Sequence, residues 1–119
     1  MTKEKKSIAV TLGAHAYQSE RAFTALNFIQ TAILEGHSVK VFLFEDGVFL
    51  AKKGQDPGNF KNGGAWLAEL VPDITEIKCC GTCIKERGIS PEELIDGVVP
   101  GTMHYLVSLV MDCDKSIAF

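Results

Sequence analysis

The chain lacks any apolar run that approaches the roughly 20 residues needed to cross a bilayer as a helix. Its N-terminus also lacks the apolar core of a signal peptide, because residues 8–12 are too few and polar residues soon follow. Positive charge is not in excess, since the net charge is −3, whereas a nucleic-acid surface needs clustered Lys and Arg. We therefore expect a cytoplasmic protein that makes no direct contact with membrane or nucleic acid.

Internal repeats, low-complexity tracts and a linker to a second domain are likewise missing from the sequence. A length of 119 residues, with 46% apolar and 23% charged residues, fits one domain that buries its own core. We expect a single domain over residues 1–119, in which residues 1–6 form a flexible tail.

Apolar, strand-like segments alternate with segments of helical periodicity along the whole chain. Ser7–Leu12 predicts a first strand buried on both faces, and Ser19 and Gly36 are predicted to cap the helix that follows. The remaining predicted strands are 39–44, 74–79, 98–99 and 115–119, and further helices are predicted near 66–70, over 82–87, from Ser90, and over 102–111. This alternation predicts an α/β fold of three layers, with a parallel sheet between helices.

Two apolar residues fall in a segment predicted to be a loop. Phe49 and Leu50 follow the turn residues after the second strand, and no strand or helix pattern includes them. Large apolar side chains are seldom left exposed in a cluster, so we expect these two in an oligomer contact.

Three of the four cysteines lie within five residues, Cys79-Cys80-Gly81-Thr82-Cys83, where a predicted strand gives way to a predicted helix. The carboxyl ends of parallel strands are where such sheets bind ligands, and the start of a helix favours a thiolate. Strand alternation directs Cys79 into the core and leaves Cys80 at the turn. Cys83 follows about one helical turn later, so its sulfur can reach that of Cys80.

Four kinds of chemistry compete for these cysteines. All four thiols can be packed as small apolar side chains, as free cysteine often is. A zinc site needs about four ligands, and Cys80 with Cys83 supplies two, so we expect no metal and no cofactor. The other two are a dithiol redox site of Cys-x-x-Cys type and a thiolate that carries sulfur as a persulfide. Spacing alone does not separate these two.

The residues around Cys80, with others in order along the chain, resemble the DsrE/TusD family of sulfur-relay proteins. The resemblance covers residues 7–119 and rests on seven features: Ala25-Leu26-Asn27-Phe28, Gly36-His37, Val41-Phe42-Leu43-Phe44, Gly47-Val48, Trp66, Cys80 followed by Arg87-Gly88-Ile89, and Cys113-Asp114-Lys115 to Phe119.

This resemblance implies a five-stranded parallel sheet and identifies Cys80 as the sulfur-carrying cysteine. It also implies sulfur donor and acceptor proteins as partners, and assembly as a homo-oligomer or with related subunits. The segments 13–17 and 101–104 differ from the TusD pattern, so a general persulfide carrier or sulfurtransferase is implied rather than a role in tRNA thiolation. The alternatives are a partner subunit without catalysis and a dithiol oxidoreductase that uses Cys80 and Cys83.

Within such a site, we expect Cys80 to accept the sulfur and Cys83 to be either a resolving thiol or a packed residue. Gly81 and Thr82 are expected to line the sulfur-binding turn, where backbone N–H groups can hold a thiolate or persulfide. His15, after the first strand, is a candidate base or hydrogen-bond partner. Lys85, Arg87 and Asp46 are assigned to solvent and to turn chemistry.

Overall fold

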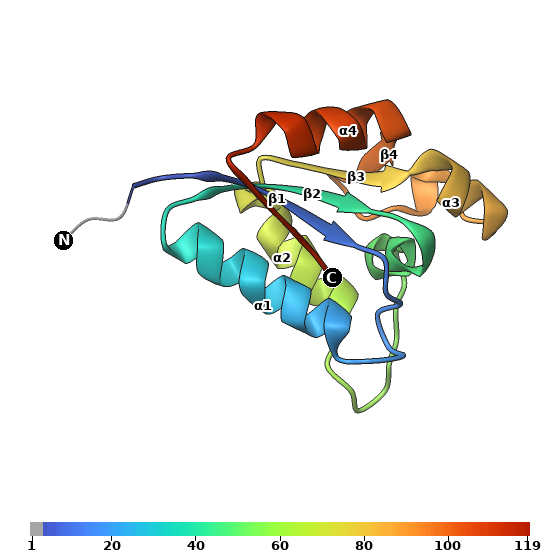
Figure 1. Ribbon diagram of the computed structural model, residues 1–119. Coiled ribbons are helices and arrows are strands. Elements are labelled where there is room, and N and C mark those ends of the chain that lie inside the picture. Colours follow the sequence, from blue (N-terminus) through green and yellow to red (C-terminus); the bar gives the residue numbers. More distant parts are fainter. Residues whose placement is uncertain (1–3) are drawn as a thin grey trace.

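The computed structural model describes residues 4–119 and contains one five-stranded sheet. Its strands are β1 (Ser7–Leu12), β2 (Ser38–Leu43), β3 (Glu76–Cys80), β4 (Val99–Gly101) and β5 (Lys115–Ala118). They lie in the order β4-β3-β2-β1-β5, and every neighbouring pair is parallel (Figure 1). The predicted parallel α/β sheet is confirmed.

Helices cover both faces of this sheet. The helices α1 (Arg21–Leu34) and α2 (Gly63–Leu70) lie against one face, and α4 (Met103–Asp112) lies against the other (Figure 1). The short α3 (Gly81–Glu86) follows β3 directly, and three 3₁₀ turns complete the chain: η1 (Glu45–Ala51), η2 (Val71–Asp73) and η3 (Pro91–Glu93). None of the helices within residues 4–119 is long and apolar enough to cross a membrane.

The side chains of the strands form a separate core on each face of the sheet. In β2, Val41 and Leu43 belong to the larger core beneath α1 and α2, whereas Phe42 belongs to a smaller core with Ala9 and Leu109 of α4. Successive strand residues point to opposite faces, so the continuous apolar run of β2 serves both cores. The second half of β2 is therefore apolar at every position, whereas β3 alternates polar and apolar residues.

The helix α1 ends as predicted and begins one residue later than predicted. Gly36 has a φ of +91°, and the N–H of His37 donates to the carbonyl of Ala32 at 3.0 Å, which is the expected glycine C-terminus. The N-cap is Glu20 rather than Ser19. The Ser19 hydroxyl instead accepts the N–H of Arg21 at 3.3 Å, within the turn before the helix.

The segment predicted to be an exposed loop after β2 is the buried 3₁₀ helix η1. Leu50 is only 2% exposed, so the prediction of an oligomer contact is wrong for this residue. Phe49 packs partly buried against the larger core, and its oligomer contact stays a prediction. Gly47 makes this packing possible, since a Cβ atom there would collide with the carbonyl oxygen of Leu12 at the end of β1. The apolar residues of η1 therefore complete the core of the chain itself.

The helix predicted from Ser90 is a single 3₁₀ turn. Its capping box is present, with the Ser90 N–H donating to the Glu93 carboxylate at 3.0 Å. The turn stops because Leu94 enters the core and forms an antiparallel bridge with Lys52. Of the predicted N-terminal tail, residues 1–3 lie outside the described residues, and the Lys6 N–H donates to His37 Nδ1 at 3.0 Å.

Candidate functional site

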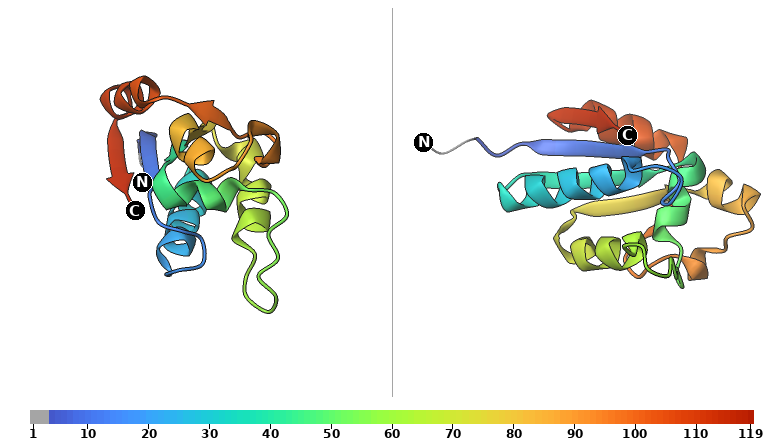
Figure 2. Two further views of the ribbon diagram at one scale, coloured as in Figure 1. Left: turned by 90° about the vertical axis from the view of Figure 1, so that its right-hand side faces the viewer. Right: turned by 90° about the horizontal axis from the view of Figure 1, so that it is seen from below.

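The carboxyl ends of the strands meet at one edge of the molecule, the right-hand side of Figure 1. The left view of Figure 2 faces this edge and shows α3, η1 and the loop after β1 around it. Cys80 ends β3 at this edge, and Glu45 begins η1 shortly after the neighbouring strand β2 ends. The parallel register therefore brings together two segments that lie far apart in the sequence.

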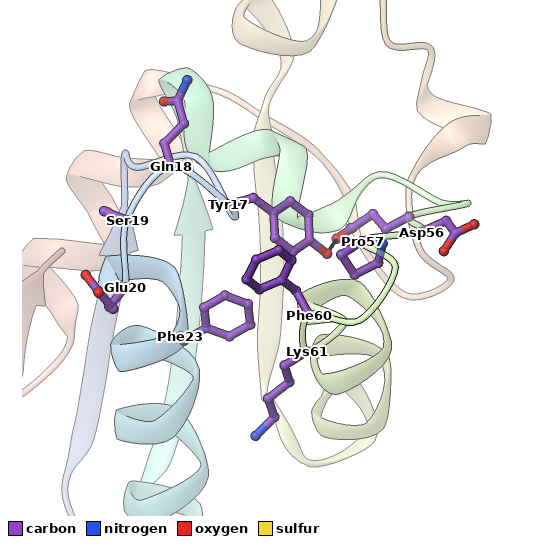
Figure 3. A pocket seen from close by; sticks show the side chains of 10 residues that line it. Tyr17, Gln18, Ser19, Glu20, Phe23, Asp56, Pro57, Phe60 and Lys61 are labelled. Atoms are coloured by element: carbon purple, nitrogen blue, oxygen red, sulfur yellow. Dashed lines mark hydrogen bonds between the residues drawn. The ribbon is translucent and has the colours of Figure 1, made fainter.

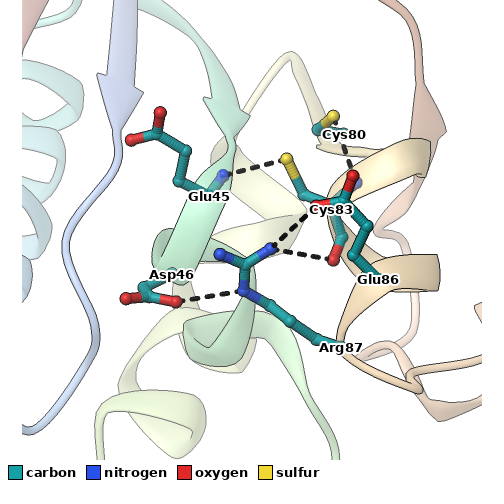
Figure 4. A network of polar contacts seen from close by, with 6 residues as sticks. All are labelled: Glu45, Asp46, Cys80, Cys83, Glu86 and Arg87. Atoms are coloured by element: carbon teal, nitrogen blue, oxygen red, sulfur yellow. Dashed lines mark hydrogen bonds and ion pairs between the residues drawn. The ribbon is translucent and has the colours of Figure 1, made fainter.

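Cys80 is both the last residue of β3 and the N-cap of α3. Its extended backbone (φ −56°, ψ 118°) turns the side chain back over the first helical turn, where Sγ accepts the N–H of Cys83 at 3.4 Å (Figure 4). The side chain is partly exposed and packs against the smaller core, on the same face of the sheet as α4. A free, reachable thiol thus lies at the edge where parallel sheets bind ligands.

Cys79 has the opposite environment although it is the adjacent residue. Its side chain is 0% exposed and lies in the larger core between the sheet and the helices. Burial, together with the nearby Cys80 and Cys83, raises the pKa of the Cys79 thiol from 9.0 to about 12. Since the thiolate is the reactive form of sulfur, Cys79 is a packing residue, as strand alternation predicted.

Cys83 is held from two sides. Its Sγ accepts the backbone N–H of Glu45 at 3.1 Å, and its carbonyl accepts a hydrogen bond from Arg87 Nη1 at 3.2 Å (Figure 4). Burial raises the pKa of the Cys83 thiol, and so does its side-chain hydrogen bond to Cys80, while the Glu45 N–H acts in the opposite direction. The Cys83 backbone nitrogen, 3.4 Å from the Cys80 sulfur, thus connects the two cysteines across this turn.

The donor to Cys83 has an unusual backbone conformation. Glu45 has a φ of +50° and is the non-glycine residue with positive φ within residues 4–119. This conformation costs an L-residue other than Gly, Asn or Asp about 1–2 kcal/mol. Such strain gathers at functional sites, and here it lies in the residue whose N–H contacts the Cys83 sulfur.

Arg87 links α3 to η1. Its Nε donates to the Asp46 carboxylate at 3.0 Å while Nη1 holds the Cys83 carbonyl. Arg87 is half-buried, with 24% of its side chain exposed, so its predicted assignment to solvent is wrong. Asp46 lies in the turn η1, in keeping with its predicted turn role, and in addition pairs with Arg87. Nothing in the sequence spacing indicates this pair, because 41 residues separate its members and only the sheet register brings them together.

The other predicted site residues divide into two groups. Gly81 and Thr82 lie in the same turn as the cysteines; Thr82 is exposed, and a Cβ atom at Gly81 would lie an ordinary 3.5 Å from the Gly101 carbonyl. His15 instead contacts its own loop and η1, since Nδ1 accepts the Tyr17 N–H at 3.1 Å and the ring lies 4.8 Å from that of Phe49. The binding roles of Gly81, Thr82 and His15 remain predictions.

No group of three or more His, Cys, Asp or Glu side chains within residues 4–119 is arranged to hold a metal ion. All four cysteines are free thiols. Free thiols can take part in thiol–disulfide exchange.

A pocket of about 780 Å³ lies between the loop after β1 and the loop before α2 (Figure 3). The rings of Tyr17, Phe23 and Phe60 face one another there, and the Tyr17 hydroxyl donates to Gln55 Oε1 at 2.5 Å. Sequence reasoning missed this pocket because Phe60 lies in a segment rich in Gly and Pro with no periodic signal. The cysteines are not among its lining residues.

A five-stranded parallel sheet with this strand order and helices on both faces has known counterparts. The model of the DsrE/DsrF-like family matches residues 6–119. This chain belongs to that family. The predicted resemblance is confirmed, and the family match covers the cysteines, η1 and every strand.

Three relatives illustrate the spread of this DsrE/DsrF-like family. An uncharacterized protein of Methanopyrus kandleri is 47% identical over 94% of this chain and 93% of its own length. The crystal structure of the YchN protein of Escherichia coli has a TM-score of 0.86 at 33% identity, covering 98% of this chain and 100% of YchN. The sulfurtransferase TusD of Pectobacterium carotovorum is 28% identical, covering 87% of this chain and 92% of TusD. The YchN structure confirms the fold.

Proposed function

We propose that this DsrE/DsrF-like protein is a sulfur carrier that holds sulfane sulfur as a persulfide on Cys80. The Cys80 thiolate attacks the outer sulfur of a donor persulfide, and the donor leaves as a thiolate. An acceptor thiolate then attacks the outer sulfur on Cys80, takes it over and restores the free thiol. Both steps are thiol–disulfide exchange reactions, which need a reachable thiolate and no cofactor.

The partial exposure of Cys80 at the carboxyl edge of the sheet is the observation that carries this proposal. Cys79, its neighbour, is sealed in the core with a raised pKa. Cys113 precedes β5, whose first residue pairs with the start of β1, so it lies at the amino edge, away from the site. Cys80 thus lies at the edge where a partner can reach it, and Cys83 lies beside it.

The relationship to TusD gives the proposal its chemistry. TusD is named a sulfurtransferase, and it aligns with most of this chain. A carrier of this kind needs a donor protein with a persulfide and an acceptor protein with a thiol, and each must bring that group to the carboxyl edge.

We place the protein in the cytoplasm because four free thiols suit a reducing compartment.

The test is to treat the reduced protein with inorganic polysulfide, remove the excess and measure the intact mass. At the first time point after the excess is removed, we expect the wild type and Cys113→Ser to have gained sulfur atoms and Cys80→Ser to have gained none. Cys113→Ser is the matched control because it removes another partly exposed thiol at the opposite edge. Equal uptake by Cys80→Ser and the wild type would refute the proposal.

Two other functions predict different masses in the same experiment. A dithiol oxidoreductase would yield a wild-type product two hydrogen atoms lighter with no persulfide at any time point, and Cys83→Ser would retain no sulfur. A subunit without catalysis would stay unchanged in every variant. A persulfide that persists in Cys83→Ser would support the carrier function and exclude both the oxidoreductase and the subunit without catalysis.

A further inference from the structure

We propose that Cys83 is the resolving thiol of the site, so that sulfur held on Cys80 is released as hydrogen sulfide when no acceptor takes it. This inference rests on the proposed function, because it needs a persulfide on Cys80. It adds a second activity, the reduction of sulfane sulfur to sulfide, with the two cysteines as the electron source.

The contacts of Cys83 are those of an oriented sulfur atom. Its Sγ accepts the Glu45 N–H at 3.1 Å, and Arg87 fixes its carbonyl at 3.2 Å while it pairs with Asp46. Glu45 keeps a φ of +50° while making its contact. A cysteine that only fills space needs neither the donor nor the bridge between α3 and η1.

Cys80 is turned toward this sulfur. As the N-cap residue it folds back over the first turn, with its Sγ accepting the Cys83 N–H at 3.4 Å. Cys80 and Cys83 have the Cys-x-x-Cys spacing of dithiol redox sites, in which the two thiols form a disulfide. The two thiols can therefore be joined within this turn.

The step balances within the protein. The Cys83 thiolate attacks Sγ of the Cys80 persulfide; a bond forms between the two Sγ atoms, and the bond from Cys80 Sγ to the outer sulfur breaks. The outer sulfur leaves with the bonding electron pair as hydrosulfide, and it takes up the proton that the Cys83 thiol released. Sulfane sulfur is thereby reduced to hydrogen sulfide, while the two thiols are oxidised to a disulfide that a dithiol reductant resets.

The rate of this step follows from the proximity of the two thiols. A tethered group has an effective concentration on the order of 1 mM, so at about 10 µM protein it should act roughly a hundred times faster than a thiol on another chain. The loss of Cys83 should therefore lengthen the lifetime of the persulfide about a hundredfold. The rate in the wild type should also be independent of protein concentration.

The experiment loads the wild type, Cys83→Ala, Cys83→Ser and Cys113→Ser with inorganic tetrasulfide, removes the excess, and follows released sulfide and intact mass. Persulfide decay is normalised to the amount present at the start. We expect the wild type and Cys113→Ser to release sulfide and end two hydrogen atoms lighter than the reduced protein, while both Cys83 variants keep their sulfur. Cys83→Ser retains an acceptor for the Glu45 N–H, so a folding defect in Cys83→Ala alone does not decide the result.

Three outcomes would overturn this inference. Equal persulfide lifetimes in the wild type and both Cys83 variants would exclude a resolving thiol and leave the carrier function intact. Transfer of the outer sulfur to Cys83, located by peptide mapping, would make Cys83 a second carrier instead. If none of the proteins holds sulfur on Cys80 at any time, the proposed function fails, and this inference fails with it.

Discussion

The contrast between Cys79 and its neighbours predicts how stability should change at high pH. Burial raises the pKa of Cys79 from 9.0 to about 12, so the folded protein holds this proton more tightly than the unfolded chain does. The stabilisation is complete below the unfolded pKa of 9.0 and is lost as the pH rises toward 12. Raising the pH should therefore favour unfolding through this thiol.

The magnitude follows from the linkage between proton binding and folding. At about pH 10 most unfolded chains have lost the Cys79 proton while the folded chain keeps it, so the free energy of unfolding should fall by about 1 kcal/mol relative to pH 8. In Cys79→Ala, the free energy of unfolding should not show this decrease of about 1 kcal/mol, because the thiol is absent. Other groups that titrate in this range affect both proteins alike. Its core cavity lowers stability at both pH values alike.

Urea unfolding under reducing conditions measures this difference. Trp66, the single tryptophan, reports the transition because it packs beside Phe23 and its Nε1 donates to Gln30 at 2.8 Å. We compare the change in the free energy of unfolding from about pH 8 to pH 10 in the wild type with the same change in Cys79→Ala. If the two changes are equal, Cys79 is not the proton-holding core thiol described here.

Three further substitutions test the surroundings of the site. Arg87→Met removes the bridge to Asp46 and to the Cys83 carbonyl, so we expect the free energy of unfolding to fall by about 1–2 kcal/mol in chemical denaturation. An unchanged denaturation midpoint would contradict a stabilising role for this bridge. Leu50→Ala should cost about 2–5 kcal/mol by leaving a cavity under η1, whereas an exposed Leu50 would cost almost nothing. Gly47→Ala should lower the melting temperature sharply because its Cβ meets the backbone of β1, while the matched Gly81→Ala should leave it nearly unchanged; similar effects for both would refute this packing.

The sheet was predictable because each strand can be recognised from its own sequence and from the residues that flank it. Ser7–Leu12 is mostly apolar and is followed by a glycine, and the structure gives the strand the same bounds. Gly36 ends α1 because its φ of +91° suits glycine, and this needs no knowledge of the tertiary fold. Sequence reasoning succeeded where one residue or one short apolar run was enough to set the local structure.

Segments whose conformation depends on distant contacts were not predictable. The apolar residues of η1 have no periodicity of their own, and they are buried because Gly47 lets them pack on the end of β1. The capping box at Ser90 correctly indicates a helical turn, but Leu94 entering the core ends it at once. Local propensity sets the start of such a turn, and tertiary packing sets its length.

The candidate site shows the same division. The positions of Cys79 and Cys80 follow from strand alternation and from the change of strand to helix, both visible in the sequence. The contacts of Cys83 do not, because Glu45 and Arg87 meet it only through the register of β2 and β3. Polar networks between elements have no spacing signature in a single sequence.

The most direct test of the account is to locate the bound sulfur by peptide-level mass spectrometry of the polysulfide-loaded protein, with free thiols and persulfides alkylated before digestion. To preserve the persulfide, the measurement is made on Cys83→Ser. The account predicts that Cys80 carries the extra sulfur and that Cys79 and Cys113 carry none. Sulfur on Cys113 with a bare Cys80 would contradict the claim that this chain carries sulfur at the carboxyl edge of its sheet.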